Sequence, residues 1–318
     1  MIHYENKLSH KTKKMNGKQL LIWTGRIASL LILFYVFFII GTMAISGMLP
    51  DIESEPGLVD ETVGFLFFGI INMLLIIGLI RSSHWNGWKL ALLLGAAYYG
   101  AVTFLTQIET WYFMSNITFD QKLLPYLFIM GLPVAFVYIP LAVLILGKGK
   151  KKEEAKLTLL LNFSSKQWIW KLIVIAIIYI LLYWSAGYFI AWQNADLRAF
   201  YGSPGDILPF WEHTAKSFHS DPGLFPFQAL RALLWTLCAI PIIRGSKVNV
   251  WWTAILVGLF FTVPQISGLI LGNPLMPIAS IRISHMIEGI ATNVVFGMII
   301  VWLLHREHNS LKDLFGIN

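Results

Sequence analysis

Charged residues are scarce in this chain of 318 residues: they make up 13% of it, whereas hydrophobic residues make up 57%. Soluble domains carry about 25% charged residues, so this composition excludes a soluble globule of the same size. Cysteine is almost absent as well. The single cysteine, Cys238, excludes an intramolecular disulfide, and its place in an apolar run indicates a small buried hydrophobe. The lipid bilayer is therefore expected to be the main solvent of the chain.

The motifs of several enzyme classes are also lacking. No Gly-x-Ser-x-Gly, Walker-type loop, dinucleotide fingerprint or His-Glu-x-x-His pattern occurs in a supporting context, which argues against serine hydrolases, nucleotide-binding proteins and zincins. Glu109, His285 and Glu288 fall within or directly beside long apolar runs, and such membrane-embedded Glu and His residues resemble those of CAAX-type intramembrane proteases. However, the paired glutamates followed by arginine that mark those enzymes are absent, because Glu109 is the single acid of its segment. The motifs thus assign the chain to none of these classes.

Eight stretches are long and apolar enough to cross a bilayer, because a hydrocarbon core of about 30 Å needs roughly 20 apolar residues in a helix. They cover residues 27–49, 63–80, 88–108, 124–147, 168–192, 227–243, 250–272 and 283–304. No segment between them is long enough to fold alone, so residues 1–318 are expected to form a single integral membrane domain. The predicted fold is all-α, a polytopic membrane helix bundle with eight transmembrane helices.

Most of the 24 Lys and Arg residues fall on one side of this topology. They precede the first span, follow the eighth, and occupy the even-numbered connections between spans. Such loops mark the cytoplasmic side, so both termini are predicted to be cytoplasmic, and the plasma (cytoplasmic) membrane is the expected location. The net charge of +7 is explained by these loops, which attract anionic membrane lipids. No nucleic-acid partner is expected.

The connection between the fifth and sixth spans, residues 193–226, is long and rich in aromatic residues. It is too aromatic for a solvated linker, and its prolines and glycines divide it into short pieces. We interpret it as an outer loop that lies on the membrane or covers the bundle, and hence as a candidate lid. A resting place at the membrane interface without any lid function is an equal alternative.

Polar residues inside the spans are the candidates for function, because ionisable groups are costly there and usually face a cavity or a partner. Those that we place around one outward-facing pocket are Glu109, Gln228, Arg231, Gln265, Arg282, His285, Glu288 and Asn293. His285, Glu288 and Thr292 follow i, i+3, i+7 spacing and share one helix face. Gln228 and Arg231 share one face of another helix, the sixth span. The pocket requires the third, sixth, seventh and eighth spans to meet.

Arg231, with Arg282, is suited to bind a carboxylate or phosphate, because a guanidinium group offers two parallel donors. The amide side chains of the set would then orient the bound group. Glu288 or Glu109 can instead neutralise Arg231, since charges inside membranes commonly pair with one another. An internal ion pair is therefore as strong an interpretation as a ligand site.

His285 and Glu288 are the candidate catalytic residues, since both can exchange protons, and they can equally couple protonation to binding. His213, His219 and Asp221 in the outer loop carry metal-binding atoms, but their spacing matches no metal motif, and no metal site is predicted. No motif identifies a cofactor.

These features favour a transporter whose pocket binds an anionic or polar small molecule or a lipid headgroup. One alternative is a membrane-embedded enzyme acting on a lipid-linked substrate at the outer leaflet, with His285 or Glu288 as acid or base and Arg231 stabilising negative charge. Another is a non-catalytic membrane subunit or sensor, whose polar residues only hold helices together. The sequence alone leaves open whether the protein is an enzyme.

Overall fold

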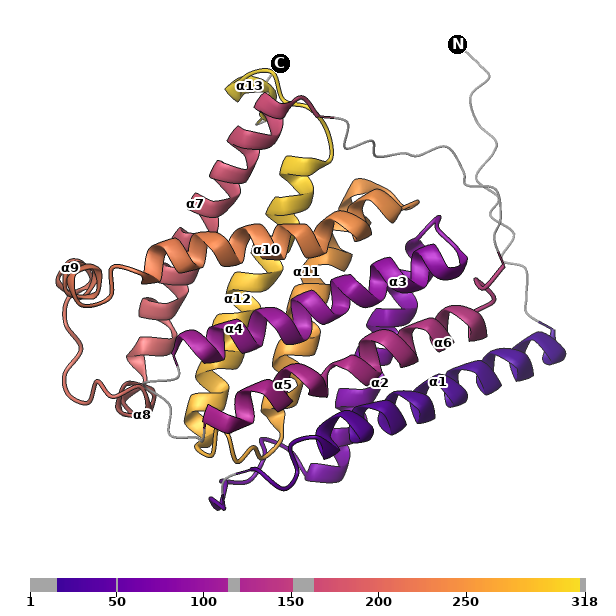
Figure 1. The fold of residues 1–318 in the computed structure, drawn as a ribbon, viewed down its shortest axis with the longest axis horizontal. Helices are drawn as coiled ribbons and strands as arrows, with labels where there is room; N and C mark the ends of the chain where they lie inside the picture. Colours follow the sequence, from indigo (N-terminus) through magenta and orange to yellow (C-terminus); the bar gives the residue numbers. More distant parts are fainter. Residues whose placement is uncertain (1–15, 50, 114–120, 151–162, 315–318) are drawn as a thin grey trace, which may run out of the picture.

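The computed structural model describes residues 16–49, 51–113, 121–150 and 163–314. Within these ranges the chain is helical, with a single isolated β-bridge and no strands (Figure 1). Eight helical segments are long and apolar enough to cross a membrane: Gly17–Met43, Glu61–Ser82, Gly87–Tyr112, Gln121–Ile145, Ser165–Gln193, Leu224–Gly245, Val250–Ile270 and Ala279–Leu304. The predicted all-α architecture with eight spans is thus confirmed, and the protein is a multi-pass membrane protein.

The first span begins earlier than hydropathy predicts, because a capping box fixes its start. Helix α1 (Gly17–Met43) begins at Gly17 rather than at Ile27. The Asn16 side chain accepts a hydrogen bond from the Gln19 backbone at 2.8 Å, and the Gln19 side chain accepts one from the Asn16 backbone at 3.3 Å. Such reciprocal bonds satisfy two backbone donors that a helix start otherwise leaves open. Helix α2 (Glu61–Ser82) is capped similarly by Asp60.

The third and fourth spans contain π-helical turns where they pack against each other. Their elements in chain order are α3 (Gly87–Tyr98), η1 (Tyr99–Phe104), α4 (Leu105–Tyr112), η3 (Gln121–Leu123), α5 (Leu124–Met130), η4 (Val134–Tyr138) and α6 (Ile139–Ile145). A Cβ atom on Gly131 would lie 1.8 Å from the Thr103 hydroxyl, so this crossing requires glycine. Each π turn changes the direction in which the following residues point, and such turns are frequent at functional sites. Helix α4, which carries Glu109, follows one of them.

The remaining elements build the second half of the bundle. They are α7 (Ser165–Phe189), η5 (Ala191–Gln193), α8 (Ala195–Phe200), α9 (Phe210–Ser220), α10 (Leu224–Gly245), α11 (Val250–Ile266), η6 (Ser267–Ile270), α12 (Ala279–Leu304) and α13 (Leu311–Leu314). Helices α11 and α12 form a tight antiparallel pair. A Cβ atom on Gly297 would lie 2.7 Å from the Gly258 backbone, so glycine on both helices permits direct backbone contact.

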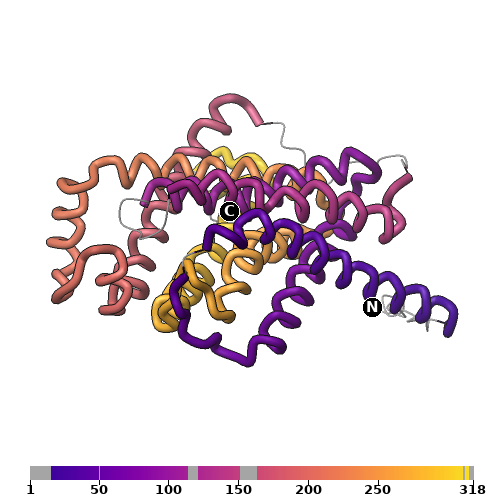
Figure 2. Tube along the Cα trace, turned by 60° about the horizontal axis from the view of Figure 1, so that its bottom comes forward, coloured from indigo at the N-terminus to yellow at the C-terminus, as the bar shows by residue number. Residues whose placement is uncertain are grey.

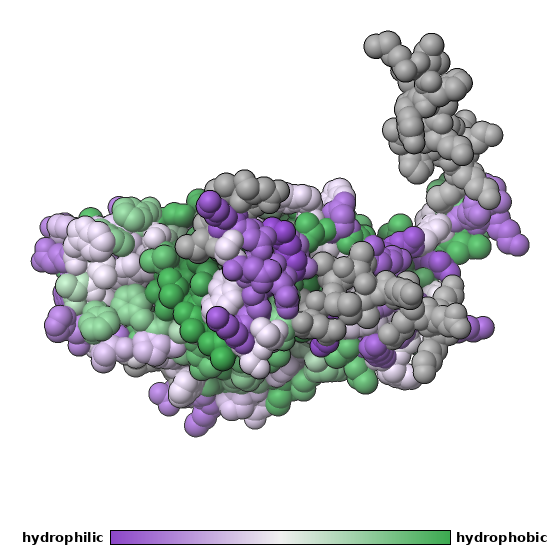
Figure 3. Space-filling model, turned by 90° about the horizontal axis from the view of Figure 1, so that it is seen from above, coloured by the Kyte–Doolittle hydropathy of each residue, from purple (hydrophilic) through white to green (hydrophobic). Residues whose placement is uncertain are grey.

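Alternate loops meet at opposite ends of the bundle, as the eight-span topology requires. At one end, Ser83 and Ser246 form the β-bridge, and the Gly87 N–H donates to the Lys148 carbonyl at 2.7 Å. We call this end the basic face, and it comprises residues 81–89, 146–150, 163–167, 244–249 and 305–314. Seen from the top of Figure 1, hydrophilic residues gather in a patch beside hydrophobic flanks (Figure 3). The predicted basic segments at residues 1–15 and 151–162 lie outside the described residues.

At the other end, which we call the opposite face, the loop after α1 runs beside the loop that joins α11 to α12 (Figure 2). Arg282, fully buried in the first turn of α12, joins these two loops. Its guanidinium donates to the carbonyls of Met276, Pro277 and Glu55 at 2.9 Å and to that of Pro56 at 2.7 Å. This side chain is therefore a clamp for loop backbone, a role that the sequence analysis did not foresee.

Replacement of Arg282 by Met is expected to lower the free energy of unfolding by about 3 kcal/mol or more, because four loop carbonyls lose a charged donor and the two loops lose the side chain that joins them. The measurement is SDS-induced unfolding of the purified protein in mixed micelles. Arg244→Met, an exposed change on the basic face, is the control and should shift stability by less than about 0.5 kcal/mol. Equal effects of the two changes would contradict the clamp.

His308 lies on the basic face with 4% of its surface exposed. Its carbonyl accepts a hydrogen bond from the Gln167 side chain at 2.7 Å, which ties the end of the chain to the start of α7. Burial, reinforced by the nearby charges of Lys171 and Arg306, lowers the pKa of His308 from 6.5 to about 4. The imidazole is thus neutral in the folded protein near neutral pH.

Because unfolding returns the pKa of His308 toward 6.5, the unfolded chain binds the additional proton between pH 6.5 and about 4. The contribution of His308 to the free energy of unfolding is expected to be complete above pH 6.5 and to be lost as the pH falls to about 4. His308→Phe should flatten this dependence, by at most about 1.4 kcal/mol per pH unit. Thermal unfolding in detergent across this pH range checks the slope, and an unchanged slope in the variant would refute it.

Candidate functional site

A cavity of about 300 Å³ lies among the helices near the opposite face. Its walls come from α4, α7, α10, α11 and α12, so the structure brings together the third, fifth, sixth, seventh and eighth spans. Tyr201, which follows α8, and Asn273, in the loop between α11 and α12, also line it. The cavity therefore reaches the loops of the opposite face. Ligand pockets commonly hold about 300 to 1,000 Å³, so this cavity suits a small ligand.

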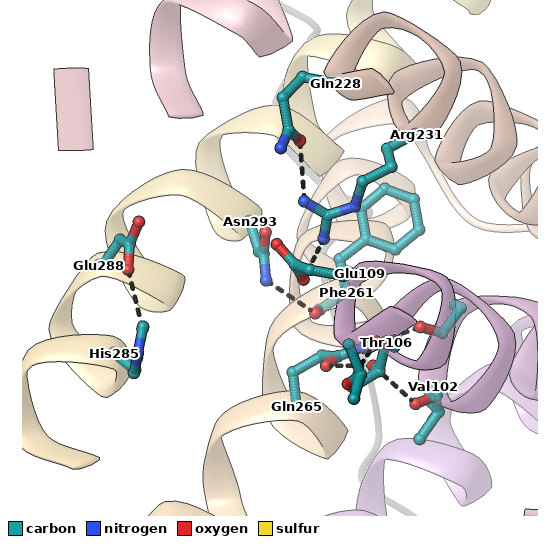
Figure 4. Close-up of polar contacts among 12 residues, drawn as sticks. Val102, Thr106, Glu109, Gln228, Arg231, Phe261, Gln265, His285, Glu288 and Asn293 are labelled. Atoms are coloured by element: carbon teal, nitrogen blue, oxygen red, sulfur yellow. Dashed lines mark hydrogen bonds and ion pairs between the residues drawn. The ribbon is translucent and has the colours of Figure 1, made fainter. Parts of the chain in front are cut away.

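Arg231 in α10 lies in one wall, held by an ion pair (Figure 4). Its Nη2 donates to Glu109 Oε2 in α4 at 2.5 Å, and its Nη1 donates to Gln228 Oε1 at 2.8 Å. The guanidinium carbon lies 5.9 Å from the ring centroids of Tyr179 and Tyr183 in α7. Both terminal nitrogens of Arg231 are thus used within the protein. The geometry favours the internal ion pair, with Glu109 as the partner.

A second polar group lies on α12, apart from the first (Figure 4). His285 Nδ1 and Glu288 Oε2 are 3.1 Å apart, and His285 Nε2 is 3.2 Å from the Tyr201 hydroxyl. Burial raises the pKa of Tyr201 above its ordinary value, so this hydroxyl stays protonated at neutral pH. The series from Glu288 through His285 to Tyr201 joins a carboxylate inside the eighth span to the segment after α8. Such a chain can pass a proton along its length.

Two amide side chains connect the helices around the cavity. Gln265 Nε2 donates to the carbonyl of Ala101 at 2.7 Å, and Gln265 Oε1 accepts from the Thr106 hydroxyl at 2.9 Å. Ala101 belongs to the π turn η1, so the seventh span is bonded to the irregular part of the third. Asn293 Nδ2 donates to the Phe261 carbonyl at 3.3 Å and joins α12 to α11. These bonds hold the helices at the separation that leaves the cavity between them.

The Thr292 hydroxyl is a buried polar group without a partner. Thr292 lines the cavity, is 5% exposed, and has no hydrogen-bond partner among the described residues. The Nε atom of Arg231 is likewise buried and has no hydrogen-bond partner among the described residues. An unsatisfied buried donor or acceptor costs about 1–3 kcal/mol, so natural proteins seldom keep one without a use. Both groups belong to residues that line the cavity, and neither is satisfied within the described part of the chain.

The predicted site residues divide by position. Those lining the cavity are Glu109, Arg231, Gln265, His285, Glu288 and Asn293. Gln228 bonds Arg231 within α10, and Arg282 is committed to loop carbonyls. The sequence analysis missed Thr106 and Tyr201. Thr106 lies one turn before Glu109, so helical spacing offered a signal for it. Tyr201 lies in the aromatic outer loop, and the many aromatic residues of that loop did not single it out.

The aromatic outer loop is folded onto the bundle. It contains α8 and α9, and the Trp184 indole of α7 donates to the Thr214 hydroxyl of α9 at 2.8 Å. At its end, the Tyr112 hydroxyl of α4 donates to Asp221 at 2.7 Å. At its start, the Asn194 side chain donates to the Ser284 hydroxyl of α12 at 3.0 Å. The loop is thus bonded to three of the helices that form the cavity.

The histidines of this loop do not gather with Asp221. His213 stacks on Trp184 with ring centroids 5.2 Å apart, and His219 Nδ1 lies 2.7 Å from the Ala215 carbonyl. Across the described part of the chain, no group of three or more His, Cys, Asp or Glu side chains is placed to hold a metal ion.

Comparisons with protein-family models, with curated proteins and with solved structures found no match.

If the ion pair orients helices α4 and α10, Glu109→Gln should lower the free energy of unfolding by about 3–5 kcal/mol, because it leaves the buried Arg231 uncompensated. Arg231→Met should lower it by less, because the Glu109 side chain that it leaves is 32% exposed. The double variant should lose less than the sum of the two. Glu288→Gln with Arg231→Met is the control pair and should be additive within about 0.5 kcal/mol. SDS-induced unfolding measures all of these variants. Coupling in the control pair instead would contradict the assignment of Glu109.

Proposed function

We propose that the cavity binds a small polar molecule or a lipid headgroup, and that the protein transports this ligand. The observation that carries the proposal is the cavity itself, which is lined by the Arg231–Glu109 ion pair, the His285–Glu288 contact and Thr292, whose hydroxyl has no partner among the described residues. Ionisable groups deep in a membrane protein commonly mark a substrate pathway. Binding sites between helices of a bundle are also where transporters hold their substrates.

The proposal includes an orientation. Loops rich in Lys and Arg favour the cytoplasmic side, so the basic face is cytoplasmic, and so are both termini. The opposite face, to which the cavity reaches, then faces outward, and the plasma membrane of the host is the proposed location. The acidic residues Glu53, Glu55 and Asp60 lie in the outer loop of this arrangement, consistent with the same charge bias.

The outer loop is proposed to control access. The contact between Tyr201 and His285 links the segment after α8 to a side chain inside the cavity. A bound ligand that changes the protonation of His285 or Glu288 therefore alters the contact that holds this segment in place. Ligand binding and the position of the loop over the cavity are thereby coupled.

A second candidate function is supported by one observation, the series from Glu288 through His285 to Tyr201. An imidazole held by a carboxylate is a recurrent arrangement in acid–base catalysis. In this alternative the protein is an enzyme that acts on a lipid-linked substrate at the outer leaflet, with His285 as the acid or base. The transporter is preferred because Arg231, which would have to stabilise developing negative charge, is already bonded to Glu109.

Native mass spectrometry of the purified protein tests the proposal. A small molecule or lipid should co-purify, and Thr292→Val should reduce its retention about fivefold or more, because the ligand loses a hydrogen bond of about 1 kcal/mol. Thr262→Val is the matched control, since the Thr262 hydroxyl is buried and bonded within α11 to the Gly258 carbonyl. Thr292→Val should fold at least as stably as the wild type, because it removes an unsatisfied group.

Reconstitution into liposomes separates the two functions. A transporter releases the co-purified molecule from loaded liposomes unchanged, whereas an enzyme leaves a chemically altered lipid that mass spectrometry detects. Identical retention by Thr292→Val and Thr262→Val would exclude the cavity as the binding site.

A further inference from the structure

The side chains that face the cavity carry more negative than positive charge when His285 is neutral. The Asp, Glu, Lys, Arg and His side chains that line it are Glu109, Glu288, Arg231 and His285. With both carboxylates ionised and His285 neutral, their sum is one negative charge. Protonation of His285 brings the sum to zero. A net positive cavity would require one carboxylate to lose its charge while His285 is charged, which the contacts of Glu109 with Arg231 and of Glu288 with His285 disfavour.

In the Glu109–Arg231 ion pair, the negative group is the more accessible one. The Glu109 side chain is 32% exposed, whereas the side chain of its partner Arg231 is 6% exposed. The terminal nitrogens of Arg231 are directed at Glu109 and Gln228 (Figure 4). A ligand in the cavity therefore meets carboxylate oxygen before it meets guanidinium. This arrangement is poorly suited to hold the anion that the sequence analysis assigned to Arg231.

Aromatic rings form much of the remaining wall. Phe113, Tyr179, Tyr183, Phe200 and Tyr201 all line the cavity. The faces of such rings attract cations, by about 0.5–1 kcal/mol at exposed sites and about 2 kcal/mol where water is excluded. Carboxylates combined with several aromatic rings are the chemistry with which proteins hold ammonium groups.

The Thr292 hydroxyl supplies an independent indication of a ligand. It is buried, lines the same cavity and has no partner among the described residues. Its oxygen can accept a hydrogen bond from an N–H group. Thr292 lies one helical turn beyond Glu288 on α12, so the two side chains share one face of that helix.

We propose that the ligand of this cavity carries an ammonium group, which binds between Glu288, Glu109 and the surrounding aromatic rings, with the Thr292 hydroxyl as an additional acceptor. This inference rests on the proposed binding function and specifies the chemistry of the ligand. A free amine and an amine-bearing lipid headgroup present the same group. The volume of about 300 Å³ admits either one.

Thermal unfolding of the full chain in detergent tests the inference with defined solutes at equal ionic strength. Ethanolamine hydrochloride and choline chloride are the ammonium probes, sodium acetate and sodium phosphate the anionic probes, and glycerol the neutral one, with sodium chloride as the reference. The ammonium probes should raise the unfolding temperature in a saturable way, and the anions and glycerol should not.

Glu288→Gln should weaken this ammonium binding about tenfold or more, because a charge-assisted contact is lost. Glu307→Gln, an exposed change on the basic face that removes the same charge, should leave it unaltered. Thr292→Val provides a second variant in case Glu288→Gln folds poorly, and it should weaken the same probes without affecting stability in sodium chloride. A Glu288→Gln protein that binds the ammonium probes as the wild type does would overturn the inference.

The remaining outcomes separate this inference from the proposed function. Stabilisation by acetate, phosphate or glycerol that Thr292→Val weakens would overturn the ammonium inference and leave a polar binding site. No stabilisation by any probe, together with no co-purified molecule, would overturn both. Native mass spectrometry from nanodiscs with or without phosphatidylethanolamine distinguishes the sources, because a headgroup ligand is retained only when that lipid is present.

Discussion

The constraint on which this structure depends is that charge inside a membrane has to be compensated by the protein itself. Arg231 meets this constraint through Glu109, and the bond joins the third span to the sixth. Glu288 contacts His285 within one helix, and His285 in turn contacts the Tyr201 hydroxyl. Because two separate pairs face one space, the helices around them cannot close into a fully apolar core. The cavity is the structural consequence of keeping both pairs.

The sequence predicted the eight spans because hydropathy measures the cost of leaving apolar side chains in water. It did not predict the start of α1 at Gly17, since a capping box depends on hydrogen bonds that hydropathy ignores. The positions of His285 and Glu288 on one helix face followed from spacing. Whether Arg231 would pair with Glu109 or Glu288 did not follow, because spacing within one helix carries no information about which helix lies beside it.

The contacts of Arg282 also could not be predicted from residue spacing. As a sequence feature it looked equivalent to Arg231, since both are arginines near the outer end of a span. The structure gives them opposite partners: loop carbonyls for Arg282, and a carboxylate and an amide for Arg231. The carbonyls belong to two loops that lie far apart in the chain. Contacts with irregular backbone have no periodicity, so the sequence contains no pattern that predicts them.

The direct backbone contact between Gly258 and Gly297 has a consequence for motion. Helices in contact at this distance cannot slide or separate without losing the packing of both, so α11 and α12 are expected to move as one rigid body. Gln265, His285 and Glu288 then keep a fixed relation to one another through any conformational cycle. A change in access to the cavity has to come from displacement of α4, α7 or α10 relative to this pair. The boundary between the two bodies therefore lies along the bonds of Gln265 to the third span, one to Ala101 in the π turn and one to Thr106 in α4.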